Sequence, residues 1–135
     1  MKAVSTFSPT TWDEKPYGEI SPPMRMTKAT VEFAFKGQFE GQGLTEYLMF
    51  YKEYDAKDPH KATAVYVGLT RFKGILNGKR GSFVTEDRGT FENGAASSVS
   101  AILKGSGTDD LKGIRGNCKS VATQNRMEFE MDFAF

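Results

Sequence analysis

Two carboxylates in this sequence alternate with apolar side chains along expected strands. A carboxylate on the apolar face of a strand is either paired with another group or functional. Glu46 lies between Leu44 and Leu48 at strand spacing, and Asp87 alternates in step with Phe83. Desolvation raises the pKa of a carboxyl group in an apolar cavity, which suits a general acid or base near neutral pH. Glu46 and Asp87 are therefore candidate catalytic residues. Glu46 is also a candidate ligand contact, and the alternative for it is a structural acid with a hydrogen-bonded or cationic partner.

The sequence contains few residues that could bind a metal, form a disulfide or act as a catalytic nucleophile. The chain has one histidine, His60, in a polar turn, and one cysteine, Cys118. These counts exclude a zinc site built from His and Cys alone and an intrachain disulfide, and they argue against a Ser-His-Asp triad. No acidic spacing resembles a calcium loop. We expect neither a metal nor a cofactor.

The charge balance indicates which partners to expect. A net charge of +1 over 135 residues creates no field that would recruit nucleic acid. The longest strongly apolar run, Tyr47 to Tyr51, is too short to cross a bilayer, and residues 1–7 lack the apolar core of a signal peptide. We therefore expect a cytoplasmic protein that binds neither nucleic acid nor membrane.

The elements that position these residues are strands. From Ala29 to Phe39 every second residue is small or apolar and the alternate residues are polar, which is the period of a strand with one dry face. Gly41-Gln42 matches a type II′ turn. That turn pairs Phe35 with Leu48 and places Glu46 on the apolar face, opposite Gly37.

Further alternating segments and turns complete the pattern. Asn77-Gly78 and Asn93-Gly94 are type I′ signals, and the first pairs Phe72 with Phe83. Val65, Val67 and Leu69 do not fit the expected dry face, and a bulge near Gly68 would reconcile them with it. The expected strands cover about residues 2–8, 29–39, 43–51, 63–76, 83–91, 95–104, 113–121 and 127–135. They predict an all-β fold in which residues 1–135 form a single eight-stranded antiparallel barrel.

The barrel interior leads to the first functional hypothesis, a site for one small apolar ligand. Residues 9–23 hold four of the five prolines and are expected to form a loop that closes one end with Trp12 packed against it. Glu46 would be the polar contact. The candidate lining residues are Trp12, Phe33, Phe35, Glu46, Phe50, Phe72 and Phe83. The alternative is that the phenylalanines simply fill the barrel.

Two other classes of function stay open. One is an isomerase or cyclase that uses a buried carboxylate, although the chain has no nucleophile–base pair. The other is a structural module that forms a homo-oligomer through an outward surface rich in Met and aromatic residues. The residues expected on that surface are Met24, Met26, Tyr47, Met49 and Tyr51.

Several segments also resemble a family of small bacterial proteins of unknown function. The matching stretches include Trp12-Asp13-Glu14-Lys15-Pro16-Tyr17, Gly41-Gln42-Gly43-Leu44-Thr45-Glu46-Tyr47-Leu48 and Gly68-Leu69-Thr70-Arg71-Phe72-Lys73-Gly74. The resemblance implies an eight-stranded up-and-down barrel similar to that of allene oxide cyclase, with no established activity. No motif allows the cyclase's catalytic residues to be carried onto this sequence, and a shared fold does not transfer chemistry.

Overall fold

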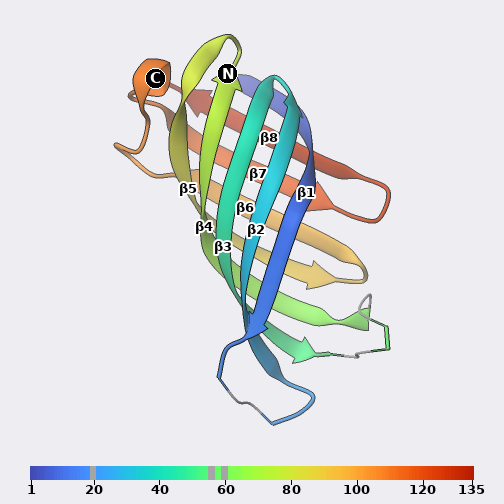
Figure 1. The fold of residues 1–135 in the computed structure, drawn as a ribbon. Coiled ribbons are helices and arrows are strands. Elements are labelled where there is room, and N and C mark those ends of the chain that lie inside the picture. Colours follow the sequence, from blue (N-terminus) through green and yellow to red (C-terminus); the bar gives the residue numbers. More distant parts are fainter. Residues whose placement is uncertain (19–20, 55–56, 59–60) are drawn as a thin grey trace.

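A computed structural model shows eight antiparallel strands in one closed barrel (Figure 1). The structure describes residues 1–18, 21–54, 57–58 and 61–135, so His60 lies outside the described residues. Each strand pairs with the next, and β1 closes the barrel against β8. The strands are β1 (Lys2–Pro16), β2 (Arg25–Gly37), β3 (Phe39–Glu53), β4 (Thr63–Leu76), β5 (Lys79–Glu92), β6 (Ala95–Ile102), β7 (Arg115–Ala122) and β8 (Met127–Ala134). The predicted fold class is confirmed.

The two Asn-Gly hairpins form as predicted. Asn77 and Gly78 have φ angles of +48° and +84°, and Asn93 is similarly left-handed at +53°. These are the positive φ values that a type I′ turn requires and that Asn and Gly tolerate. Phe72 therefore pairs with Phe83, as expected.

The turn between β2 and β3 is not where the sequence placed it. The chain reverses at Gly37 and Gln38, so Phe35 pairs with Gly41 and not with Leu48. Gly37 has a φ of +134°, and the Gln38 amide donates to the Val4 carbonyl of β1. The register differs from the expected one by an odd number of residues, which exchanges the two faces of β3.

This shift reverses the predicted inside and outside of β3. Glu46 lies on the outer surface with its side chain 60% exposed, and Phe50 shares its outward parity. The inward positions are instead taken by Tyr47, Met49 and Tyr51, so these three residues cannot form the expected oligomer surface.

Strand β4 continues the same inversion. Its pairing with β3 and β5 runs from Ala64 to Leu76 without interruption, so the bulge predicted near Gly68 is absent. The apolar residues that this bulge would have turned inward, Val65, Val67 and Leu69, lie exposed on the outer surface.

β1 is much longer than predicted. Residues 9–16 continue the strand, and a bulge at Thr10 shifts the register between Pro9 and Thr11. A bulge inserts one residue and re-aims the side chains that follow. Trp12 therefore faces the interior side opposite Val31, but it is 52% exposed and does not pack under a closing loop.

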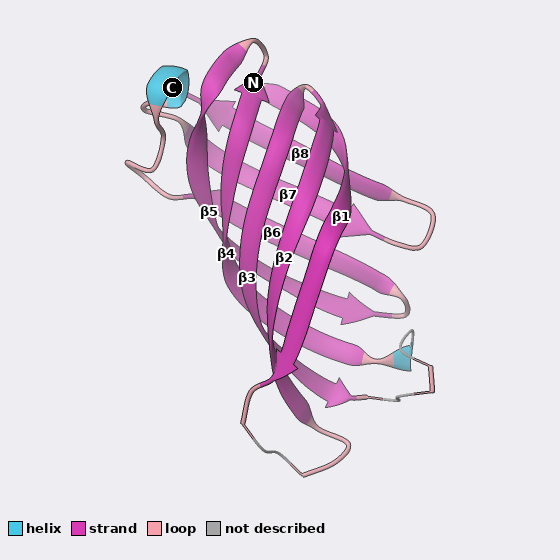
Figure 2. Ribbon diagram, viewed as in Figure 1, coloured by secondary structure: helices cyan, strands magenta, loops and turns pink. Residues whose placement is uncertain are grey.

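Two hydrophobic clusters lie inside the barrel. The larger, around Phe39, Phe72 and Phe83, occupies the end that carries both termini and the short 3-10 helix η2 (Asp109–Leu111), whose Leu111 is fully buried (Figure 2). The smaller lies around Val31 and Tyr66 toward the other end. Among the described helices, none is long and apolar enough to cross a membrane.

Candidate functional site

A cluster of buried polar side chains lies inside the barrel. At its centre Asp87 on β5 is only 4% exposed. Its carboxylate accepts hydrogen bonds from Thr70 Oγ1 at 2.5 Å and Thr85 Oγ1 at 2.7 Å. Thr45 Oγ1 lies 2.7 Å from Thr70 Oγ1 and extends the network onto β3. Three neighbouring strands therefore contribute to one buried polar cluster.

Glycines on neighbouring strands make room for two tyrosines beside this cluster. In register, Gly68 stands between Tyr47 and Asp87. A Cβ atom on Gly68 would clash with the Glu46 carbonyl oxygen and would also crowd the Tyr47 ring at 2.8 Å. A Cβ atom on Gly89 would overlap the far end of the Tyr66 ring. The Tyr66 hydroxyl crosses this gap to bond Ser98 Oγ on β6. The glycines thus allow two phenol rings to cross the interior.

A cavity of about 120 Å³ lies inside the barrel on the side of the Asp87 cluster that faces the β5–β6 and β7–β8 turns. A smaller recess of about 40 Å³ reaches Asp87 and shares part of its lining with the cavity. The shared residues are Phe7, Phe33, Tyr47, Ser98 and Ser120. The space therefore runs from an aromatic mouth to a polar inner end.

Burial governs the electrostatics of this region. Desolvation raises the pKa of Asp87 above that of an ordinary carboxyl, and its hydroxyl partners only partly oppose the rise. Burial also raises the pKa of the Tyr47 and Tyr66 phenols, with the charge of Asp87 adding to both rises. Among the ion pairs of the described residues, none involves Asp87.

A second carboxylate, Glu14, organises the mouth and was missed by the sequence argument. It accepts hydrogen bonds from Trp12 Nε1 at 3.0 Å, Thr27 Oγ1 at 2.6 Å and the Tyr51 hydroxyl at 2.6 Å. The bulge at Thr10 brings Glu14 to the inner side. Strand parity carried on from Phe7 would have placed it outside.

The candidate ligand-contact residues separate into three groups. Trp12 and Phe33 line the cavity, and Phe35 and Phe72 line the recess together with Asp87. Phe83 is fully buried in the larger hydrophobic cluster, stacked on Phe72 with ring centroids 4.8 Å apart. The inward orientation expected for Glu46 and Phe50 is wrong, because the β2–β3 register turns both outward.

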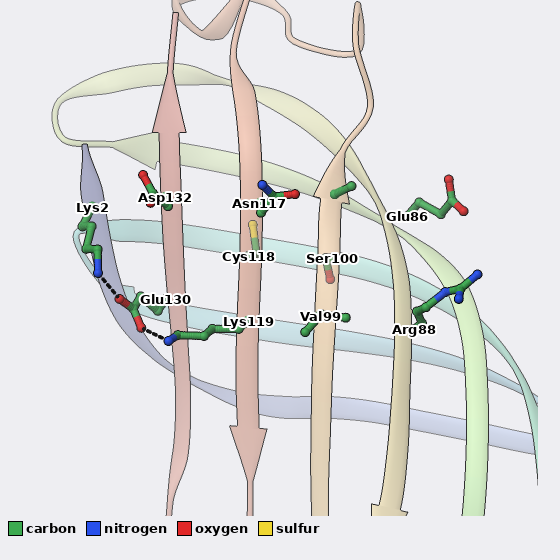
Figure 3. A pocket seen from close by; sticks show the side chains of 11 residues that line it. Lys2, Glu86, Arg88, Val99, Ser100, Asn117, Cys118, Lys119, Glu130 and Asp132 are labelled. Carbon is green, nitrogen blue, oxygen red and sulfur yellow. Dashed lines mark ion pairs between the residues drawn. The ribbon is translucent and has the colours of Figure 1, made fainter.

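Two larger depressions lie on the outer surface. One, of about 640 Å³, crosses β5 to β8 and β1, and Figure 3 shows Lys2 and Lys119 pointing at Glu130 from either side. Both ion pairs measure 3.2 Å, and both lysines are well exposed. The other depression, of about 660 Å³, continues past Ser120 and Lys36. Exposed ion pairs of this kind contribute little to stability. The interior, which holds a buried carboxylate, is the stronger candidate site.

Metal-binding groups do not gather within the part of the chain that the structure describes. No three side chains of His, Cys, Asp or Glu lie close enough there to hold an ion. Cys118 is free and buried, and burial raises the pKa of its thiol to about 12. That thiol is a poor nucleophile at neutral pH.

Comparison with known proteins agrees with this barrel. The family model described as a protein of unknown function, DUF3224, matches residues 3–135. The chain belongs to this family. A DUF3224 protein of unknown function from Shewanella oneidensis MR-1 is 20% identical and superimposes with a TM-score of 0.77 over 100% of this chain and 97% of that one. At this identity the likeness shows the shared barrel alone, while the family resemblance seen in the sequence is confirmed. No curated protein matches the DUF3224 chain.

Proposed function

We propose that this barrel binds one small, largely apolar molecule in its interior, with the polar group of that molecule at Asp87. The observation that carries the proposal is a buried carboxylate at the inner end of an aromatic cavity. Ligand sites are typically apolar spaces with a few convergent polar groups, and groups with a perturbed pKa cluster at such sites.

The size of the space limits the ligand. An engineered cavity of roughly 150 Å³ holds one benzene molecule. The cavity of about 120 Å³ with its 40 Å³ recess therefore suits a compact molecule whose apolar body is about one ring in size. The half-exposed Trp12 at the mouth gives such a molecule a route from solvent.

The single tryptophan provides a direct assay. Trp12 lines the cavity, so its emission should change when a small aromatic probe such as toluene or benzyl alcohol enters. Two substitutions on β6 separate the interior from the outer surface. Ala96→Phe fills the cavity, whereas Ala101→Phe places the same ring in the outer depression.

We expect the probe to bind to the wild type and to Ala101→Phe. The affinity of Ala96→Phe for the probe should be lower by at least about tenfold. Circular dichroism and thermal unfolding establish that both variants are folded. Binding that is equally strong in both variants, or that is lost only in Ala101→Phe, contradicts an interior site.

A second candidate is a proton-transfer enzyme of the isomerase or cyclase class. The observation that favours it is the raised pKa of Asp87 beside two buried phenols, the environment of a general acid or base. A small aryl ketone incubated in deuterium oxide tests it. Exchange of the ketone's α-hydrogens that disappears in Asp87→Asn supports proton transfer, and exchange no faster than in buffer contradicts it.

The exposed residues of β3 and β4 favour a role in self-association as well. Leu44, Leu48, Val65, Val67 and Leu69 form an outer apolar patch, each about half exposed. Contiguous exposed apolar surface often marks an interface. We propose a second copy of this chain as the occupant, because charges beside the patch are self-complementary. Val67 pairs in register with Arg88, and Leu69 with Glu86.

A two-fold axis that passes between the Val67–Arg88 pair and the Leu69–Glu86 pair would bring Arg88 of each copy opposite Glu86 of the other. Val67→Glu should therefore convert a dimer to a monomer in sedimentation equilibrium. Val4→Glu places the same charge at an exposed site on β1 outside the patch and should leave the dimer intact. A wild type that is monomeric at all concentrations contradicts the proposal.

We also propose the cytoplasm as the working compartment. With one cysteine the chain can form no intrachain disulfide, which suits a reducing environment. Fractionation of cells that express the protein with its natural ends tests this assignment, and recovery outside the cytoplasmic fraction contradicts it.

A further inference from the structure

Resting on the interior site proposed above, we infer that its ligand is a small primary amine, bound as the ammonium ion with its nitrogen at Asp87 and its apolar body in the aromatic cavity. Three independent features of the described residues carry this inference: an uncompensated charge, a recess of matching size, and walls that favour a cation.

The first feature is the charge balance of the interior. Asp87 is buried, and its partners Ser100, Thr70 and Thr85 are neutral hydroxyls. Within the described residues, the ion pairs formed by lysines, arginines and the N-terminus all lie at the surface. A buried carboxylate without a counter-charge is costly, so a ligand that brings a positive charge gains more than a neutral one.

The second feature is the form of the recess. Its volume of about 40 Å³ is close to the roughly 30 Å³ that one water molecule occupies in the liquid. An ammonium head is similar in size to a water molecule and donates three hydrogen bonds. Asp87, Ser98, Ser100 and Ser120 line the recess and offer oxygen acceptors on three neighbouring strands.

The third feature is the wall of the cavity. Aromatic rings attract cations through the negative potential of their faces. Six aromatic side chains line the cavity: Phe7, Trp12, Phe33, Tyr47, Tyr66 and Phe91. They provide an apolar surface for the body of the amine and favourable faces for a cation that passes from the mouth toward Asp87.

The competing possibility is a neutral ligand that meets a protonated Asp87. An alcohol or a carbonyl compound can bond to the carboxylic acid form without any charge, and burial favours that form. The amine and the alcohol of one carbon skeleton distinguish the two cases. Benzylamine and benzyl alcohol differ only in the polar head, and toluene lacks a polar group.

The experiment measures the affinity of these three probes at neutral pH by calorimetry and by Trp12 emission. We expect wild-type protein to bind benzylamine at least about tenfold more tightly than benzyl alcohol, because only the ammonium brings a positive charge to the Asp87 carboxylate. Asp87→Asn should remove this preference and leave the affinity for toluene within about threefold. Glu46→Gln removes one exposed carboxylate, with the same change in net charge, and should keep the preference.

Each other outcome is decisive. If benzyl alcohol binds as tightly as benzylamine to the wild type, the amine inference is overturned while the interior site stands. If Asp87→Asn keeps the amine preference, Asp87 is not the counter-charge and the inference again fails. If no probe binds, or if Ala96→Phe leaves binding unchanged, the proposed interior function fails. Where Asp87→Asn does not fold by circular dichroism, the wild-type comparison of amine and alcohol decides alone.

Discussion

Asp87 on β5 accepts a hydrogen bond from Thr70 on β4, and this bond joins the two strands inside the barrel. Both residues are buried, so their contact lies within the protein and not in solvent. Hydroxyl donors offset part of the desolvation cost of the carboxylate but supply no positive charge. The Asp87 carboxyl is therefore buried in the barrel interior without a cationic partner among the described residues.

The stability of the protein should depend on pH through Asp87. Burial raises its pKa above that of the unfolded chain, so the native state keeps a proton that the unfolded state has already lost. The free energy of unfolding consequently falls as pH rises from the ordinary carboxyl range through the folded pKa of Asp87, by at most about 1.4 kcal/mol per pH unit. Below the unfolded pKa the slope is zero, and the stabilising contribution of the raised pKa is fully present.

Asp87→Asn should remove that slope, as measured by urea unfolding at a series of pH values. The other titratable groups that interact with Asp87 are Tyr47, Tyr66, Cys118 and Glu86. The two phenols and the thiol stay neutral over the acidic range, and Glu86 is present in both proteins. A difference between wild type and variant that does not change with pH contradicts the assignment.

Substitution of Glu46 should have almost no effect on stability. The carboxylate is exposed and its nearest cation, Lys28 Nζ, lies 3.7 Å away in solvent. Such surface pairs contribute little, so Glu46→Gln should change the free energy of unfolding by no more than about 0.5–1 kcal/mol. Thermal or urea unfolding measures this. A loss of about 3–5 kcal/mol would indicate a buried ion pair and an inward-facing side chain.

Trp12 emission should be that of a partly hydrated indole. The side chain is 52% exposed and its N–H donates to Glu14. Acrylamide should therefore quench the free protein strongly, and a probe bound in the cavity should reduce the quenching. Glu14→Gln weakens the acceptor of the indole bond and should increase quenching further. Emission that is blue-shifted and shielded in the free protein would instead support a closed lid.

The overlap between Gly89 and Tyr66 predicts a specific coupling. A methyl group at Gly89 meets the end of the Tyr66 ring, so Gly89→Ala should destabilise the fold by about 1–3 kcal/mol. In a Tyr66→Leu background the shorter side chain leaves that space open, and the same change should cost much less. A double-mutant cycle by urea unfolding measures the difference. Equal costs in both backgrounds would show that the clash is with the backbone.

Much of the barrel could be predicted because its signals are local. The Asn-Gly pairs specify left-handed turns, and each turn sets the register of the two strands beside it, as Phe72 and Phe83 show. Alternation in β2 and β8 identifies their buried faces correctly. The inward orientation of Asp87 could be predicted from that of Phe83, because alternate residues of a strand share a face and no bulge lies between the two.

The inner and outer faces of β3 and β4 could not be read from the same rules. Their outward positions hold Leu48, Val67 and Leu69, whereas their inward positions include Thr45 and Thr70. This pattern reverses the usual one, so hydrophobicity alone selects the wrong register and places Glu46 inside. Closure of the barrel decided otherwise, because the Gln38 amide bonds to β1 and the chain must reverse at Gly37.

The sequence by itself determined the number of strands, the Asn-Gly hairpins and the all-β class, because each depends on residues close together in the chain. Only the tertiary structure decided what faces the interior. The bulge at Thr10 turned Trp12 and Glu14 inward, and the β2–β3 register turned Glu46 out and Tyr47 in. One inserted residue or one odd shift reverses every later side chain of a strand, and such a shift is selected by pairing with distant strands.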